Sequence, residues 1–126
     1  MSEVPGHPAV AFAARHGFLA VTMPARVPTA QAPTTLADLK VLEGLNDQGL
    51  TFSLLSYPTA AGKQAAVAAT QAVLSASDLG SWALGQCATV AEVKAALAAQ
   101  PVMLQPLQLL GGVESPFHYV VHDATG

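Results

Sequence analysis

The chain has 126 residues, the size of one ordinary domain, since domains most often run to roughly 100 to 150 residues. Its composition is 52% hydrophobic and only 10% charged, well below the average charged share of about a quarter. The five Lys and Arg residues are spread singly and the formal net charge is -3, so no basic stripe is available for nucleic acid. We therefore expect a single unit, residues 1–126, with much of its surface buried or covered.

Targeting and cofactor signals are few. No apolar stretch reaches the ~20 residues that a membrane-spanning helix requires, and residues 1–8 lack the basic start and apolar core of a signal peptide, so they are interpreted as an irregular leader. One cysteine, Cys87, excludes an internal disulfide and a multi-cysteine zinc site. We expect no membrane partner and no cofactor. The compartment stays open: cytoplasmic, or periplasmic if the N-terminus is truncated.

The first half of the chain predicts two β-hairpins. Residues 9–23 are rich in Val, Phe and small residues, with a turn at residues 15–17, and the prolines of residues 24–33 indicate a surface loop. The second hairpin is the clearer one. Its strands are residues 41–45 and 50–58, and Gly49 in the connection can take the positive φ that a tight turn often demands.

The second half predicts helices and then a strand. Residues 63–74 are rich in alanine, with Val67 and Leu74 on one face, and a second helix is expected to begin at Ser77-Asp78. Thr89 and Glu92 match a capping box, which predicts a third helix ending near Gln100.

The last part of the chain predicts an open sheet edge. Pro101 ends the third helix, and residues 117–121 predict a strand that runs into a turn at residues 123–126. Such a strand favours a return strand that is not in this sequence, and folded proteins normally cover an unpaired edge. A homo-oligomer is therefore among the expected partners.

Three segments carry a pattern beyond secondary structure. They are G-L-N-D-Q-G-L at residues 44–50, C-A-T-V-A-E-V at residues 87–93, and P-F-H-Y at residues 116–119. In this order and at this spacing, the chain from about Pro8 onward resembles the choloylglycine hydrolase family, which includes penicillin V acylases and bile salt hydrolases.

The resemblance implies an α+β fold that is part of an N-terminal nucleophile (Ntn) hydrolase αββα sandwich, with antiparallel sheets packed against helices. In this family a cysteine at the mature N-terminus attacks an amide carbonyl. Its free α-amine, with a pKa near 7.7 to 8.0, can serve as the general base. The family's substrates are small-molecule amides.

The sequence departs from the family at the decisive place. Residue 1 is Met, no cysteine lies near it, and the Arg and Asp that follow the family nucleophile are missing upstream of Pro8. The family's later Asn and Arg would lie beyond Gly126. We therefore expect a central fragment with no catalytic residue of its own, inactive alone.

One position of the family's substrate pocket falls within the chain. The register of GLTFSLLSYP places Ser56 where relatives carry an Asn or Tyr that helps hold the substrate carbonyl. Serine is smaller but still donates one hydrogen bond. Ser56 is therefore the predicted substrate-binding residue.

Several residues also carry alternative hypotheses. Cys87, His118 and Asp123 could form a Cys-His site, although a lone Cys beside an alanine-rich helix usually packs as a small hydrophobe. Ser2 would become a nucleophile if Met1 were removed. The strand spacing of His118 and His122, ~13 Å, is too long for one metal ion.

The remaining polar, aromatic and glycine residues have structural interpretations. Asn46 and Asp47 are expected in the turn and Trp82 in the core. Gly111 and Gly112 lack the Lys-Ser/Thr ending of a phosphate loop.

Two functions follow as hypotheses. In the first, the complete protein hydrolyses a linear amide C–N bond, in an acylated amino acid, a bile salt conjugate, penicillin V or an acyl homoserine lactone. In the second, the chain is a non-catalytic remnant or a dimerising interaction domain, which the low charge and the open sheet edge favour.

Overall fold

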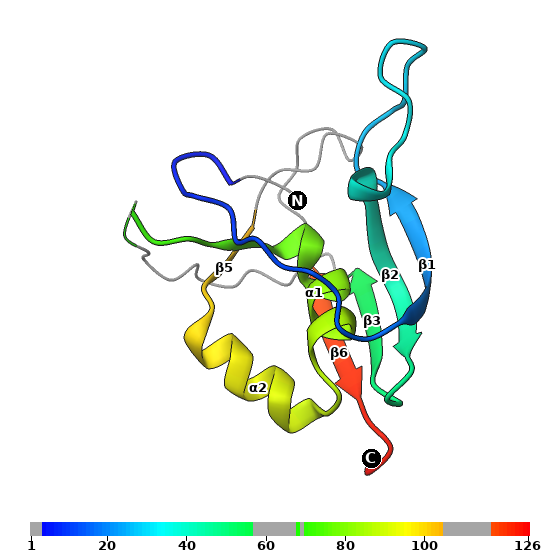
Figure 1. Ribbon diagram of the computed structural model, residues 1–126, viewed down its shortest axis with the longest axis vertical. Helices are drawn as coiled ribbons and strands as arrows, with labels where there is room; N and C mark the ends of the chain where they lie inside the picture. Colours follow the sequence, from blue (N-terminus) through cyan, green and yellow to red (C-terminus); the bar gives the residue numbers. More distant parts are fainter. Residues whose placement is uncertain (1–3, 57–67, 69, 105–116) are drawn as a thin grey trace.

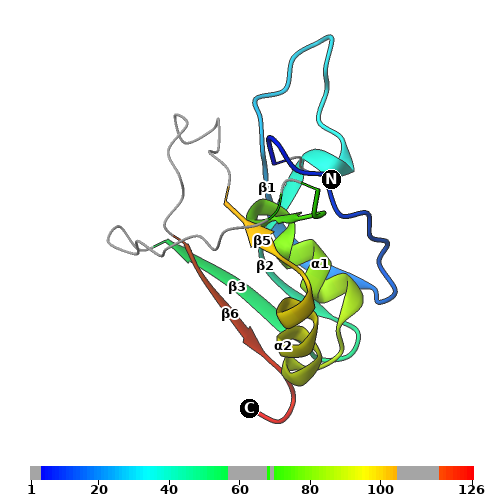
Figure 2. The ribbon, with the colours of Figure 1, turned by 90° about the vertical axis from the view of Figure 1, so that its left-hand side faces the viewer.

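A computed structural model of the chain describes residues 4–56, 68, 70–104 and 117–126. In chain order the elements are β1 (Phe18–Pro24), η1 (Leu36–Asp38), β2 (Leu39–Asn46), β3 (Thr51–Ser56), β4 (Leu74–Ser75), η2 (Ala76–Asp78), α1 (Leu79–Gln86), α2 (Val90–Ala99), β5 (Val102–Met103) and β6 (Phe117–His122). A four-stranded antiparallel sheet of order β1-β2-β3-β6 has α1 and α2 on one side (Figures 1 and 2). The expectation of an α+β fold is confirmed.

The hairpin of β2 and β3 has the predicted strands and turn. Gly44 lies opposite Phe52, and Gly49 has a φ of 86°, a conformation that only glycine adopts without strain. The buried Leu50 follows the turn directly. The local signal was strong here because the turn residue and the two flanking strands pointed to the same structure.

The prediction of a first hairpin at residues 9–23 is wrong. Only its second half is a strand, β1, which pairs with β2 from Phe18–Asn46 to Pro24–Leu39. The first half crosses the end of α1 instead, where the backbone N–H groups of Arg15 and His16 donate to the Gly85 carbonyl at 2.7 and 3.1 Å. A side chain at Gly85 would come within 3.1 Å of Ala14, so glycine permits this close crossing.

The helix predicted over residues 63–74 is contradicted at its end. Leu74 is a fully buried strand residue of β4, which pairs in parallel with β5. Both strands have two residues, too few for a period-2 pattern to be visible in the sequence. Residues 63–67 and 69 lie outside the described part of the chain.

Both later helices begin where the sequence indicated. The helix predicted at Ser77-Asp78 is α1, and the helix after Thr89 is α2, which ends at Ala99. The Thr89 hydroxyl accepts from the Glu92 N–H at 3.2 Å, as a capping box requires. The Glu92 carboxylate accepts from the Ala88 N–H at 2.7 Å, one residue further back than predicted.

The core lies between α1 and the sheet. Phe52, Leu84 and Trp82 are buried together there, so the prediction of Trp82 as a core residue is confirmed. Gly80 lets α1 approach closely, since a Cβ at this position would lie 2.8 Å from atoms of Phe52 and Val41. None of the helices within the described ranges has the length and apolar character that crossing a membrane takes.

The opposite face of the sheet, which we call the outer face, is apolar and uncovered by any described residue. Its exposed large side chains are Leu19 (83%), Val21 (62%), Leu45 (51%) and Leu55 (54%). Leu19 lies directly opposite Leu45 in the pairing of β1 with β2. Exposed aliphatic residues gathered on one face indicate a surface that is buried in an assembly or a larger fold.

The side chain of Asn46 joins the hairpin to the helical layer. Its Oδ1 accepts from the N–H groups of Gln48 and Leu50 at 3.0 and 2.9 Å, which confirms the predicted turn role. Its Nδ2 donates to the carbonyls of Leu84 and Cys87 at 2.9 and 2.7 Å. Because Asn46 is only 4% exposed, water cannot take its place as the hydrogen-bond partner of these backbone groups.

We expect Asn46→Asp to destabilise the fold by about 3 kcal/mol at pH 7, because the isosteric carboxylate cannot donate to two buried carbonyls and is itself desolvated. Protonation restores a donor and the buried site raises the pKa of the new carboxyl, so the loss should grow as pH rises above about 4. Urea unfolding across pH measures this. Asp47→Asn, on the exposed side of the same turn, is the control, and equal losses in the two variants at pH 7 would rule out the proposed role.

Candidate functional site

Ser56, the predicted substrate-binding residue, is the last residue of β3. It pairs with Phe117, the first residue of β6, and two residues earlier Leu54 pairs with Tyr119. The predicted role of Ser56 stays a prediction. Its backbone position can nevertheless be compared with the surrounding side chains.

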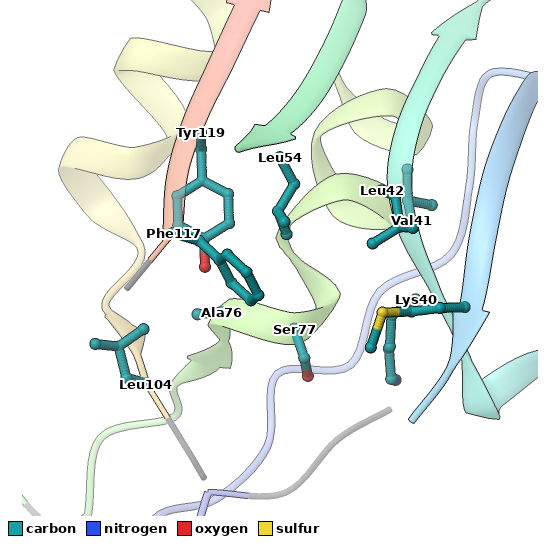
Figure 3. Close-up of a pocket in the computed structure, with 10 residues that line it drawn as sticks. Lys40, Val41, Leu42, Leu54, Ala76, Ser77, Leu104, Phe117 and Tyr119 are labelled. Atoms are coloured by element: carbon teal, nitrogen blue, oxygen red, sulfur yellow. The ribbon is translucent and has the colours of Figure 1, made fainter. Parts of the chain in front are cut away.

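A small apolar cavity lies beside this end of β3 (Figure 3). Its volume is about 30 Å³. It is lined by side chains from four strands, from η2 and from the residue after β5: Met23, Lys40, Val41, Leu42, Leu54, Ala76, Ser77, Leu104, Phe117 and Tyr119. The cavity faces the helical layer, because Leu54 and Tyr119 also pack against the core.

A buried ion pair borders the cavity. The Lys40 ammonium lies 2.5 Å from a carboxylate oxygen of Asp78 and also donates to the Ala37 carbonyl at 2.9 Å. The side chains of Lys40 and Asp78 are 8% and 7% exposed. Breaking such a pair leaves an uncompensated buried charge, so it fixes η2 and the start of α1 against β2. The sequence did not predict this ion pair, because Lys40 and Asp78 are 38 residues apart.

Tyr119 supplies a further polar group of the cavity. Its ring packs against Phe52, with ring centroids 6.0 Å apart and an interplanar angle of 37°. Burial raises the pKa of the Tyr119 phenol above its usual value, so the hydroxyl keeps its proton at neutral pH. Tyr119 lies in the P-F-H-Y segment, but the sequence alone gave it no role.

The alternative site of Cys87, His118 and Asp123 is not assembled. Cys87 lies at the end of α1 and is 3% exposed, within the core on the helical side of the sheet. His118 lies on the other face of the sheet. It is exposed and pairs with the exposed Leu55, whereas its neighbour Tyr119 packs against the core. The hypothesis of a Cys-His enzyme is therefore wrong.

Asp123 has a structural role. Its carboxylate accepts from the Val90 N–H at 2.8 Å, at the start of α2, and from the Thr125 N–H and hydroxyl at 2.9 and 2.6 Å. These hydrogen bonds, that of the Thr125 hydroxyl above all, hold the pKa of Asp123 below its usual value. The residue joins the terminal turn to the helical layer.

The remaining candidates contribute no further site. His118 and His122 lie opposite Leu55 and Thr51, four residues apart on β6. Among the described residues, no group of three or more His, Cys, Asp and Glu could hold a metal ion. Ser2, Gly111 and Gly112 lie outside the described residues, and the single unit of residues 1–126 stays a prediction.

Comparison with known proteins identifies the family. Residues 34–126 match the model of the linear amide C–N hydrolases, choloylglycine hydrolase family. The chain belongs to this family. The predicted resemblance is thereby confirmed. A search of curated proteins found no match.

Solved structures of the choloylglycine hydrolase family share the fold. Two variants of the conjugated bile acid hydrolase from Clostridium perfringens superpose with TM-scores of 0.66 and 0.64, at 19% and 18% identity, over 91% of this chain and 32% of theirs. Penicillin V acylase from Agrobacterium tumefaciens gives a TM-score of 0.53 at 20% identity, over 69% of this chain and 24% of its own. This chain thus spans about a third of the bile acid hydrolase, and the fold is confirmed as part of the Ntn-hydrolase type.

The burial of Cys87 predicts an inert thiol. Desolvation raises its pKa, the nearby Glu92 charge adds to this, and Arg15 opposes it. We expect the native protein to react with a disulfide reagent at pH 8 at least ~100 times more slowly than the urea-unfolded chain, because the buried thiol is both protonated and shielded. The reaction is followed by release of the chromophoric thiol. Rapid reaction of the folded protein would restore Cys87 as a candidate nucleophile.

Proposed function

We propose that this chain is the scaffold of an amidase that cleaves linear amide C–N bonds, and that it is inactive by itself. The family match over residues 34–126 carries the proposal. It is supported by the buried Cys87, the chain's single thiol, and by the failure of Cys87, His118 and Asp123 to meet. The nucleophile has to come from elsewhere.

The proposed chemistry is that of an N-terminal nucleophile. An N-terminal cysteine thiol attacks the amide carbonyl carbon while its own α-amine, with a pKa near 7.7 to 8.0, accepts the thiol proton. The protonated α-amine gives this proton to the leaving amine as the C–N bond breaks, and water then hydrolyses the acyl-enzyme to the acid and the free thiol. The contribution of this chain is to hold the β3 end, with Ser56 at the substrate carbonyl, against a rigid helical layer.

The substrate is proposed as an N-acyl amide: an acylated amino acid, a bile salt conjugate, penicillin V or an acyl homoserine lactone. The two kinds of structural relative are named for a conjugated bile acid and for penicillin V.

We expect this chain to leave all members of an amide panel intact, and a version extended by flanking coding sequence that supplies an N-terminal cysteine to hydrolyse at least one. Amine release measured by liquid chromatography follows the reaction. An extended protein whose cysteine is changed to alanine is the matched control. Hydrolysis by the short chain would contradict the missing nucleophile, and an inactive extended protein would contradict the amidase.

A second candidate is self-association through the outer face, with another copy of this chain as the partner. The exposed Leu19, Val21, Leu45 and Leu55 support it. Antiparallel sheets pack face to face about 10 Å apart with their apolar residues interdigitated, and a second copy presents such a sheet.

For this candidate we expect a dimer by size-exclusion chromatography with light scattering, and conversion to monomer by Leu45→Lys, because a lysine cannot be buried in the centre of a sheet-to-sheet contact. Leu36→Lys, at an 88% exposed position on η1, should leave the dimer unchanged. A wild-type chain that stays monomeric at high micromolar concentration excludes this interface.

A further inference from the structure

A groove in the helical layer is separate from the cavity at the β3 end. We call it the helical groove. Its volume is about 560 Å³, within the ~300 to 1,000 Å³ of small-molecule sites. None of its lining residues lines the smaller cavity. The segment before β1, the helix α1 and the helix α2 contribute to it, among others with Arg15, His16, Trp82, Gln86, Glu92 and Ala96.

The segment before β1 is fixed to the end of α1, which it passes on its way to β1 (Figure 1). The backbone N–H groups of Arg15 and His16 donate to the Gly85 carbonyl. The Arg15 guanidinium donates to the Gln86 carbonyl at 2.7 Å, and the Gln86 side chain donates to the Ala13 carbonyl. A guanidinium has five N–H donors, so the exposed Arg15 is held in place with further donors for a ligand.

The helix α2 places a carboxylate in the same groove. One oxygen of Glu92 accepts from the Ala88 N–H at 2.7 Å. The backbone N–H of Glu92 donates to the Thr89 hydroxyl at 3.2 Å. These two hydrogen bonds fix the carboxylate at the start of α2, and its second oxygen is free to accept from a ligand cation.

The charges of Arg15 and Glu92 do not neutralise each other. Among the described residues neither belongs to an ion pair, whereas the Nδ1 atom of His16 lies 3.7 Å from a carboxylate oxygen of Asp47. Both charges lie near Cys87 in the lining: burial raises the pKa of this thiol, Glu92 adds to the rise and Arg15 opposes it. The helical groove therefore contains one cation and one anion that are fixed but not paired with each other.

The rest of the lining is largely apolar. Trp82 and Cys87 are 7% and 3% exposed, so only a small part of each reaches the helical groove. Ala95 and Ala96 contribute methyl groups from α2. Hydrocarbon that covers this surface is removed from water. The complementary ligand thus carries an anionic group, a cationic group and an apolar body.

We infer that the helical groove binds a short zwitterionic peptide with an apolar side chain, whose carboxylate pairs with Arg15 and whose ammonium pairs with Glu92. A guanidinium matches a carboxylate with two parallel hydrogen bonds. A simple acid or a simple amine would leave one of the two charges without a partner. The inference goes beyond the proposed amidase and does not rest on it, because the helical groove shares no lining residue with the cavity at the β3 end.

The test is a titration of the chain with three probes. The first is the dipeptide L-alanyl-L-leucine. The second is its N-acetyl derivative, which lacks the ammonium, and the third is its C-terminal amide, which lacks the carboxylate. Trp82 is the one tryptophan of the chain and lines the helical groove, so its fluorescence reports binding there.

The variants remove one charge at a time. Arg15→Met keeps an unbranched side chain, and Glu92→Gln keeps an oxygen that can accept from the Ala88 N–H. Lys94→Met is the matched control for Arg15→Met, because Lys94 is exposed on α2 and does not line the helical groove. Equal urea midpoints establish that the variants are folded.

We expect the dipeptide to bind with a Kd on the order of 1 mM, as its small size predicts. Arg15→Met should weaken binding of the dipeptide and of its N-acetyl derivative about three- to fivefold at low ionic strength, and leave binding of the amide unchanged. Glu92→Gln should weaken binding of the dipeptide and of the amide by a similar factor, and leave the N-acetyl derivative unchanged. Lys94→Met should have no effect on any probe.

Three results would overturn the inference. The first is an unchanged Trp82 fluorescence up to a dipeptide concentration about tenfold above the expected Kd. The second is equal binding of the three probes to the unaltered chain, which would show that the ligand's charges are not recognised. The third is an equal loss of affinity in Arg15→Met and Lys94→Met, which would indicate general electrostatic attraction.

Discussion

The buried amide of Asn46 is the constraint on which the rest of this structure depends. It closes the β2–β3 turn with its oxygen and holds the last turn of α1 with its nitrogen, through the carbonyls of Leu84 and Cys87. A buried polar group is stable only when all its partners are in place. The hairpin and α1 therefore have one permitted relative position. This also restricts the position of α2, because Thr89, the N-cap of α2, lies only two residues after Cys87.

This constraint explains four positions of the G-L-N-D-Q-G-L segment at residues 44–50. A Cβ at Gly44 would lie 2.6 Å from the Leu84 side chain, Asn46 makes four hydrogen bonds, and Gly49 has a positive φ. Leu50 is fully buried. These four positions therefore have roles in packing or backbone geometry. The structure gives none of them a role in chemistry.

Sequence patterns predicted the elements whose signals are local. The β2–β3 hairpin, the starts of α1 and α2, and β6 were predictable because a turn glycine, a cap or a β-rich run marks each one. The pairing of β4 with β5, the crossing of residues 9–17 over Gly85, and the Lys40–Asp78 ion pair depend on segments distant in sequence. Single-sequence periodicity contains no information on such contacts, so these features required the structure.

The distinction between local signals and contacts distant in sequence also applies to the candidate site. The strand position of residue 56 could be predicted because the register of β3 relative to the turn is fixed, and a shift by one residue would exchange the two faces of β3. Its role in substrate binding stays a prediction. The place of Tyr119 beside Leu54 could not be predicted, because it arises only when β6 pairs with β3, and these strands are far apart in the sequence. The cavity beside the end of β3 is lined by side chains from four neighbouring strands, among them Met23, Leu54 and Tyr119, which are far apart in the chain. No local motif connects these residues, so their common location could be found only from the structure.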